Sequence, residues 1–160
     1  MACRKYHLGQ VTKRKSTAFG IFPISLTDEG AHDPVFHGLP NPFYAVDSRD
    51  WQVLSGDEEQ FEQQHAEVAA IEKRRPHVDL ERCIMSIRFS KEVMGTQFHP
   101  EADPIGMKVH LQDASLSEKI IELHGEDKYQ DMLQSLDDPN RITITQKLII
   151  PNFLNEAIHQ

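Results

Sequence analysis

Apolar and polar positions alternate most clearly between residues 83 and 98. The apolar members of the alternation are Cys83, Met85, Ile87 and Phe89, and the polar ones include Ser86, Arg88 and Ser90. This period of two is typical of a β-strand with one buried face. Residues 93–98 continue as a second run, so the pattern predicts a β-hairpin.

Shorter strand-like runs precede this hairpin. They cover residues 11–17, 19–26, 43–46, 51–54 and 67–72. Gly20 and Pro23 interrupt the second run, and residues 47–50 (DSRD) are expected to form a polar tip between the third and fourth. Residues 1–8 read as the last turns of a helix that ends at Gly9.

After Pro104 the spacing becomes helical. Ile120, Ile121 and His124 share one helix face, Gly125 interrupts, and a second stripe follows at Tyr129, Met132, Leu133 and Leu136. Asp138-Pro139 is typical of a helix start, and Pro151 predicts a kink in the final helix. The order therefore predicts an α/β domain over residues 1–112 and a helical extension over 113–160 that packs on it. The second stripe is assigned to the core, with an interface, including one between copies of the chain, as the alternative.

Composition and charge narrow the function classes. The chain has 160 residues, of which 39% are hydrophobic and 26% charged, and no run approaches the ~20 apolar residues of a membrane span. The net charge is −8, although residues 1–27 contain five cations and no acid. A mitochondrial presequence or nucleic-acid arm is the alternative for this basic start, and an exposed strand with solvated charges is the simpler interpretation. An acidic remainder repels phosphate backbones, so nucleic acid is not expected as a partner.

Cysteine and histidine positions predict neither disulfides nor a metal. Cys3 and Cys83 are too few and too distant for a disulfide framework, which favours a cytoplasmic setting. His32 and His37 lie five apart in a turn-rich loop without a second cluster, so no metal or other cofactor is expected. The basic run at residues 73–75 (KRR) is interpreted as a solvated strand end.

The stretch His99-Pro100-Glu101 carries the clearest candidate chemistry. Proline holds the residue before it in an extended conformation, and side chains two apart on an extended segment point to the same side. His99 and Glu101 can therefore project together. A carboxylate that holds one imidazole nitrogen while the other faces a reacting group forms two thirds of a nucleophile triad.

These residues lie within a wider resemblance. GTQFHPE (residues 95–101) is similar to the histidine–glutamate signature of class I glutamine amidotransferase domains, the kind found in GMP synthase. FGIFPI (residues 19–24) resembles central strands of that family, and DPVFHGLP (residues 33–40) resembles one of its turns. The resemblance covers residues 1 to about 110. It implies the C-terminal part of a flavodoxin-like α/β fold, here followed by added helices.

The resemblance also implies a reaction and its residues. In that family a cysteine thiolate attacks the side-chain amide of glutamine, and the ammonia released passes to an acceptor domain or a synthase partner. His99 takes the position of the general base and acid, and Glu101 that of its orienting carboxylate. Ser48 and Arg49 match a substrate-holding segment in which relatives carry histidine, so both are substrate-binding candidates, with a polar hairpin tip as the alternative.

The family's Gly-x-Cys-x-Gly nucleophile motif does not occur in this sequence. Cys3 has no neighbouring glycine, and Cys83 lies on an apolar strand face. Residues 1–9 resemble the end of the helix that follows the nucleophile. We therefore expect a truncated domain that is inactive alone, and whether the chain is an enzyme stays open. A non-catalytic interaction or regulatory protein on the same scaffold is the alternative, and an unrelated α+β binding module is a third.

Overall fold

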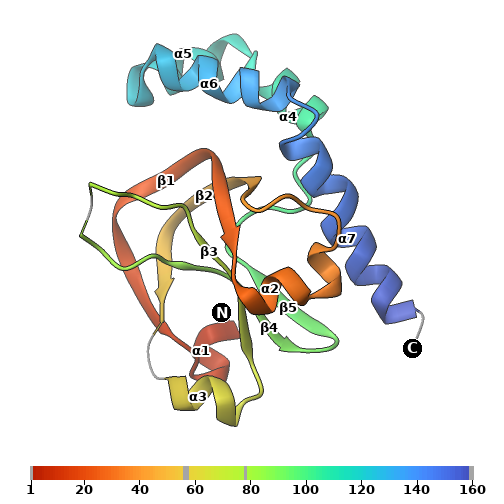
Figure 1. The fold of residues 1–160 in the computed structure, drawn as a ribbon. Coiled ribbons are helices and arrows are strands. Elements are labelled where there is room, and N and C mark those ends of the chain that lie inside the picture. Colours follow the sequence, from red (N-terminus) through yellow and green to blue (C-terminus); the bar gives the residue numbers. More distant parts are fainter. Residues whose placement is uncertain (1, 56–57, 78, 159–160) are drawn as a thin grey trace.

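A strongly curved antiparallel sheet forms the centre of the computed structural model, which describes residues 2–55, 58–77 and 79–158 (Figure 1). Its strands are β1 (Gln10–Leu26), β2 (Phe43–Leu54), β3 (Glu67–Glu72), β4 (Ile84–Ser90) and β5 (Val93–Thr96), in the order β2-β1-β3-β4-β5. Beyond β5, the His99 backbone N–H donates to the Val46 carbonyl at 2.9 Å. This bond brings the two edges of the sheet together, so the sheet is a partial barrel.

The first two strands differ from the prediction. Residues 10–26 form one strand, because a register shift between Lys13 and Ala18 lets β1 bend without ending. Residues 43–54 also form one strand, and the predicted polar tip at residues 47–50 is wrong. These residues pair with β1 through Arg49 opposite Ala18 and Asp47 opposite Gly20. The ladder satisfies their backbone groups, and a polar pattern alone does not reveal such a partner.

The hairpin of β4 and β5 is confirmed, but both faces of β4 are covered. Ser86 and Arg88, expected on a more polar face, are 1% and 9% exposed. Arg88 donates to Asp33 at 2.7 Å and to Glu156 at 2.9 Å. Its charge is therefore neutralised by carboxylates from segments far away in the sequence.

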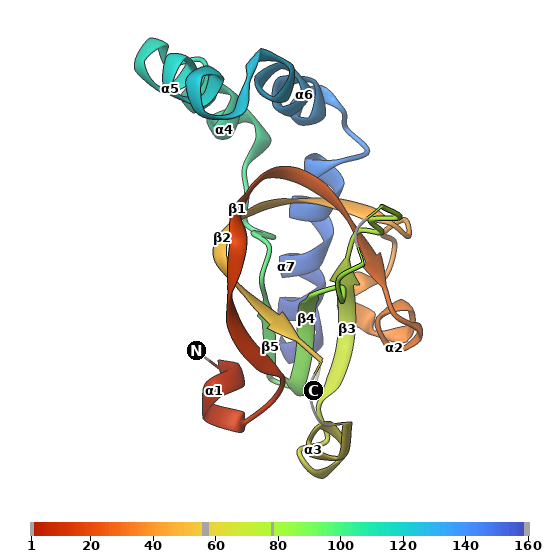
Figure 2. The ribbon, with the colours of Figure 1, turned by 90° about the vertical axis from the view of Figure 1, so that its left-hand side faces the viewer.

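Short helices surround the barrel, with α1 and α3 at one end and α2 beside β3 (Figure 2). They are α1 (Ala2–Tyr6), α2 (Asp28–His32), the 3-10 helix η1 (Pro34–Phe36) and α3 (Glu58–Gln63). The Thr27 side chain caps α2 by accepting from the Gly30 N–H at 3.0 Å, and Asp33 caps η1 by accepting from the Val35 N–H at 2.9 Å.

The predicted helical region is confirmed as four helices. They are α4 (Pro104–Leu111), α5 (Ala114–His124), α6 (Glu126–Asp137) and α7 (Ile142–Ile158). The predicted stripe buries Tyr129, Met132 and Leu136 of α6 in one cluster with Ile21 of β1. The last helix begins later than expected, because the Asp138 carboxylate accepts from the Asn140 N–H and stabilises a turn there.

The final helix crosses the side of the barrel and reaches its main core. Ile149 of α7 is 3% exposed and lies in one cluster with Val35, Phe43 and Phe98. The Thr145 hydroxyl also donates to the Tyr44 carbonyl of β2 at 2.6 Å. The division at residue 112 stays a prediction; it falls between α4 and α5, and α7 shares its core with residues before that boundary.

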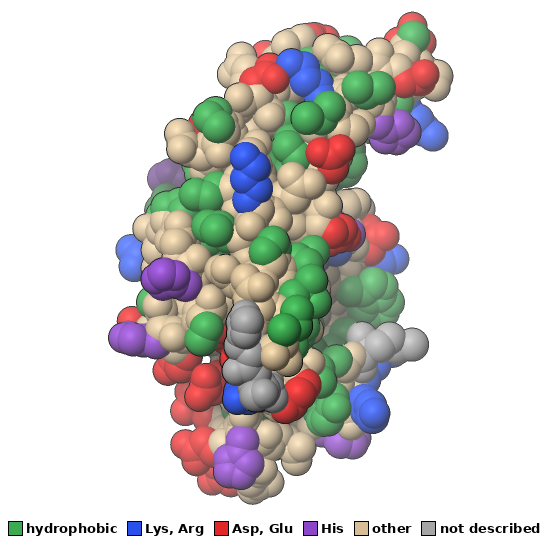
Figure 3. Space-filling model, turned by 90° about the vertical axis from the view of Figure 1, so that its right-hand side faces the viewer, with side chains coloured by type: hydrophobic (Ala, Val, Ile, Leu, Met, Phe, Trp, Pro, Cys, Tyr) green, Lys and Arg blue, Asp and Glu red, His purple; other side chains and the backbone are tan. Residues whose placement is uncertain are grey.

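The outer side of α7 carries apolar side chains (Figure 3). Ile150, Leu154 and Ile158 are 36%, 51% and 72% exposed. None of the helices in the described ranges combines the length and the apolar character that crossing a bilayer requires.

Candidate active site

His99 and Glu101 come together in the turn between β5 and α4. His99 Nδ1 lies 2.9 Å from Glu101 Oε1, and the two side chains are 46% and 60% exposed. The hydrogen bond from the His99 N–H to the Val46 carbonyl holds the backbone at the start of this turn. At its end, the Asp103 carboxylate caps α4 by accepting from the Gly106 N–H at 2.8 Å. The predicted pairing of His99 and Glu101 is therefore present, with both side chains open to a ligand.

The electrostatics of the pair favour an ionised carboxylate. Partial burial acts to raise the pKa of Glu101, but hydrogen bonds from His99 and from the Glu101 backbone N–H outweigh it and lower that pKa below its usual value. An ionised carboxylate accepts a hydrogen bond from Nδ1–H. Nε2 is then the ring nitrogen that can exchange a proton with a reacting group.

Ser48 and Arg49 lie on opposite faces of β2. Residues directly opposite each other on antiparallel strands share a face, so the Val46–His99 bridge places His99 on the face of Val46. Ser48, two residues from Val46, lies on that same face and is exposed. Arg49 points to the other face, where its Nε donates to Asp47 at 2.9 Å and its Nη2 to Glu72 at 3.4 Å. The structure thus brings Ser48 toward the candidate site and leaves the Arg49 side chain engaged elsewhere.

Neither cysteine contacts the His99–Glu101 pair. Cys3 belongs to α1, which packs at the far part of β2, where Arg4 lies over the Trp51 ring at 5.5 Å. Burial raises the pKa of Cys3 and also that of Cys83, whose Sγ lies 3.2 Å from Gln52 Oε1. A raised pKa disfavours the thiolate, which is the nucleophilic form.

Comparison with known proteins supports the fold by structure alone. No family model matches the sequence, and no curated protein matches it. Among solved structures, a glutamine amidotransferase from Thermotoga maritima superposes on 95% of this chain with a TM-score of 0.65 at 11% identity, and SMU.1228c superposes on 98% with a TM-score of 0.62 at 14% identity. A GMP synthase-type protein from Thermoplasma acidophilum matches 74% of this chain and 53% of its own, with a TM-score of 0.43 at 17% identity.

Over most of its length the chain has the fold of the Thermotoga glutamine amidotransferase and of SMU.1228c. It spans 56% of the Thermotoga protein and 58% of SMU.1228c, so it corresponds to little more than half of each. The expected α/β class with C-terminal helices is confirmed, and the strands in the described part of the chain pair antiparallel.

The sequence did not predict a second polar cluster, which surrounds Glu72. Arg14, expected to be solvated, has a side chain only 12% exposed and lies 3.2 Å from Glu72. In the basic run at residues 73–75, only Arg74 is exposed, whereas Arg75 lies 2.9 Å from Glu72. Arg14 and Glu72 lie on strands that are far apart in the sequence, and nothing in the local pattern of either strand indicates that the two pair. The cluster could therefore not be predicted from the sequence. Over the described ranges, no three His, Cys, Asp or Glu side chains are placed to hold a metal.

Proposed function

We propose that this chain is the part of a glutamine amidotransferase domain that bears the histidine and the glutamate. The observation that supports it is the 2.9 Å His99–Glu101 pair, exposed on a fold similar to a glutamine amidotransferase. In this proposal His99 carries the proton and Glu101 holds its ring. Ser48, on the same face, contributes to glutamine binding, while Arg49 acts from behind the strand through Asp47.

The proposed reaction needs a thiol that this pair does not contact. The thiolate sulfur bonds to the amide carbon of glutamine, and His99 delivers a proton to the departing nitrogen, which leaves as ammonia. Water then attacks the thioester, His99 takes its proton, and glutamate leaves as the thiol reforms. Since burial raises the pKa of both Cys3 and Cys83, we propose that another stretch of polypeptide supplies the thiol.

Several partners follow from this assignment. Glutamine is the proposed substrate, and a synthase partner or acceptor domain is the proposed recipient of the ammonia. The proposed setting is cytoplasmic, because both cysteines are free. The proposal includes no metal or other cofactor.

A glutaminase assay tests this function. The purified 160-residue protein is expected to release no ammonia from glutamine above the rate of a His99→Ala control. When a polypeptide that bears the thiol is added, we expect ammonia release that depends on His99. Robust release by the chain alone, abolished by Cys3→Ala, would show that Cys3 is the nucleophile and that the thiol is not supplied from outside.

A non-catalytic binding protein on the same scaffold is the second candidate. The raised pKa of both thiols favours it, because the chain then holds polar side chains for a ligand but no activated nucleophile. Titration calorimetry with glutamine separates the two candidates. Suppose that glutamine binds, that Ser48→Ala weakens this binding, and that no thiol-bearing polypeptide added to the chain leads to ammonia release. Such a result would favour the glutamine-binding protein over the enzyme.

A further inference from the structure

A second pocket lies on the face of the sheet opposite the His99–Glu101 pair. Its volume is about 250 Å³, and neither His99 nor Glu101 lines it. Asp47 lines it from β2, and because Asp47 follows Val46 in the strand, its side chain points away from the face that holds His99. The pocket is therefore separate from the candidate active site.

Cations outnumber carboxylates around this pocket. Arg14, Lys73 and Arg75 line it together with Asp47 and Glu72, and Arg49 pairs with both carboxylates from behind. Glu72 alone is shared by three guanidinium groups, at 3.2 Å, 3.4 Å and 2.9 Å. Four cations face two carboxylates, which leaves an excess of two positive charges in a chain whose net charge is −8.

Two guanidinium groups of this cluster also keep buried donors without a protein acceptor. Arg49 Nη1 and Arg75 Nε are buried and have no hydrogen-bond partner among the described residues. Glu72 Oε2 also has no hydrogen bond there, but it lies 2.9 Å from Arg75 Nη2, so its charge is balanced by an ion pair. Arg49 has a side chain 7% exposed. A buried unpaired donor is costly, and an oxyanion in the pocket would offset that cost for Arg75 directly and reduce the repulsion within the cluster.

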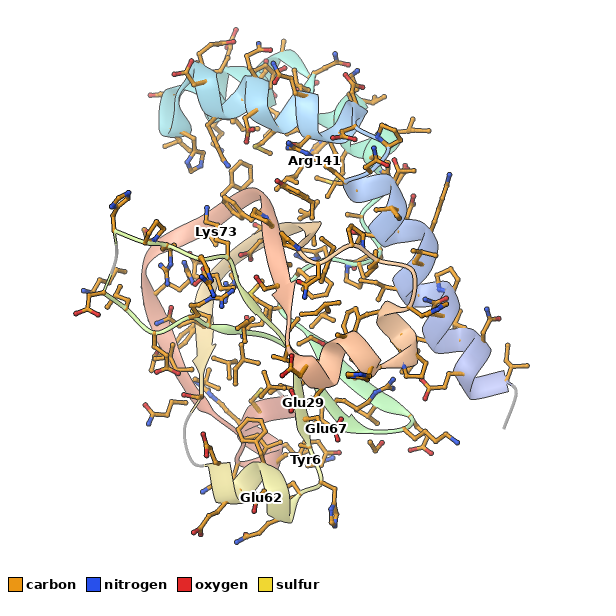
Figure 4. The ribbon with its side chains drawn as sticks, in the orientation of Figure 1. Tyr6, Glu29, Glu62, Glu67, Lys73 and Arg141 are labelled. Atoms are coloured by element: carbon orange, nitrogen blue, oxygen red, sulfur yellow. The ribbon has the colours of Figure 1, made fainter. Side chains whose placement is uncertain are left out.

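Lys73 is the cation best placed to meet a ligand. Over the described part of the chain, no carboxylate lies within ion-pair distance of its ammonium group, which instead lies 4.2 Å from the centre of the Phe22 ring. It extends at the end of the sheet that faces α5 and α6 (Figure 4). Lys128 of α6 approaches the same ring at 4.3 Å, and Gly20 leaves room for it, since a Cβ there would lie 2.5 Å from Lys128 Nζ. Two ammonium groups thus approach the Phe22 ring, and of the two only Lys73 lines the pocket.

The remaining wall of the pocket is aromatic. Phe22, opposite Ala45, shares the face of Asp47 and lines the pocket. Phe19, opposite Ser48, points to the other face and borders the pocket at its rim, where His124 of α5 stacks on it with ring centroids 4.8 Å apart. Ligand pockets combine such apolar walls with a few convergent polar groups, and a typical drug-sized site has roughly 300–1,000 Å³. The smaller volume here indicates a small ligand.

We propose that this pocket binds a small dianion that carries an apolar ring or chain. Its oxyanion faces Lys73, Arg75 and Arg14, and its apolar part packs against Phe22. Guanidinium groups match the oxygens of phosphate and carboxylate groups alike, so phosphate monoesters and dicarboxylates share the chemistry that this pocket recognises. The site does not depend on the proposed amidotransferase function.

Titration calorimetry at low ionic strength tests the proposal with three probes. Phenyl phosphate and phenylsuccinate are the two dianions that carry a ring, and inorganic phosphate is the dianion without one. Saturable binding of at least one ring-bearing probe, tighter than that of inorganic phosphate, is expected. The probe that binds more tightly identifies the phosphate or the dicarboxylate class. Equal affinity for all three, or no binding below about 10 mM, would overturn the proposal.

Two matched variants locate the binding. Lys73→Met removes the unpaired cation and is expected to weaken binding at least about tenfold, whereas Lys119→Met, on the exposed face of α5, makes the same charge change and should alter it less than about twofold. If Lys73→Met fails to fold, Arg75→Gln is the alternative variant, and it is also expected to weaken dianion binding. His99→Ala should leave dianion binding unchanged, which keeps this site distinguishable from the glutamine site. If Lys73→Met and Lys119→Met weaken dianion binding equally, the binding reflects nonspecific electrostatic attraction and the proposed pocket is contradicted.

Discussion

At the scale of the residue, the His99–Glu101 pair is the clearest link between sequence and chemistry. A turn over residues 99–102, in which the Ala102 N–H donates to the His99 carbonyl at 3.4 Å, brings the two side chains together, and the backbone bond to Val46 holds His99 against β2. Both side chains are about half exposed, so the pair contributes little to stability and its geometry is more relevant to function.

The first prediction concerns the titration of Glu101. Its pKa is lowered in the folded chain, so its contribution to stability is present above the ordinary value of 4.5 and is lost as the pH falls through the lower folded pKa. Carboxyl chemical shifts recorded against pH are expected to show a Glu101 midpoint below 4.5 in the native chain. His99→Ala should move that midpoint upward, because it removes the hydrogen bond.

Asp113 is the internal control for this titration. The Ser115 side chain lowers its pKa, and His99 does not contact it, so His99→Ala should leave its midpoint unchanged. A Glu101 midpoint that stays the same after His99→Ala would mean that the pair does not form in solution.

At the scale of the element, α2 shows how close packing depends on a single glycine. Gly30 is buried in α2 against β3, and a Cβ there would lie 1.8 Å from the Ala69 carbonyl oxygen. The Thr27 hydroxyl draws the helix onto the strand by donating to the Val68 carbonyl at 2.6 Å. Because the atoms in the way belong to backbone, neither element can yield without moving as a whole.

We predict that Gly30→Ala lowers the free energy of unfolding by about 3 kcal/mol, at the upper end of overpacking costs. Urea denaturation followed by circular dichroism measures the change. Gly106→Ala in α4 is the matched control, since the nearest atom there belongs to the Asp103 side chain, which can move at the cost of its capping bond to the Gly106 N–H, while alanine has the higher helix propensity. Its effect should stay within about 1 kcal/mol, the range of helix propensity. An equally small effect at both glycines would contradict the close contact of α2 with β3.

At the scale of the whole molecule, α7 determines whether the chain unfolds as one unit. The helix contributes Ile149 to the main core, and Asn152 donates to the Val35 and His37 carbonyls at 3.1 Å and 3.0 Å. Its Glu156 also reaches Arg88 of β4. Contacts to η1, β2 and β4 therefore tie residues far beyond position 112 to the partial barrel.

Ile149→Ala is expected to cost about 2–4 kcal/mol, because truncating a buried isoleucine leaves a cavity. Ile150→Ala, at the exposed neighbouring position, should change stability by less than about 0.5 kcal/mol. In the unmodified chain and in both variants, Trp51 fluorescence and helical circular dichroism should change together in a single urea transition. Two separate transitions would instead support residues 113–160 as an independent helical extension.

Local patterns predicted the elements whose neighbours are close in sequence. The β4–β5 hairpin, β3 at residues 67–72 and the buried stripe of α6 all follow from periodicity within one segment. Prediction was wrong where a distant partner decided the outcome. Asp47 and Arg49 form a regular part of β2 because β1 and Glu72 meet them, and neither partner is near them in the chain.

The sequence by itself determined the mixed α/β class, the helical C-terminal part and the His99–Glu101 pair, because each depends on spacing within a few residues. Only the tertiary structure decided that Ser48 lies on the His99 face and Arg49 behind it, since that depends on which strand bridges residue 46. Only the tertiary structure also placed Arg14, Lys73 and Arg75 around one pocket, because β1 pairs with β3 and the residues that follow β3 then lie near Arg14. Interactions between residues far apart in sequence arise from this closure of the sheet, and no local pattern records it.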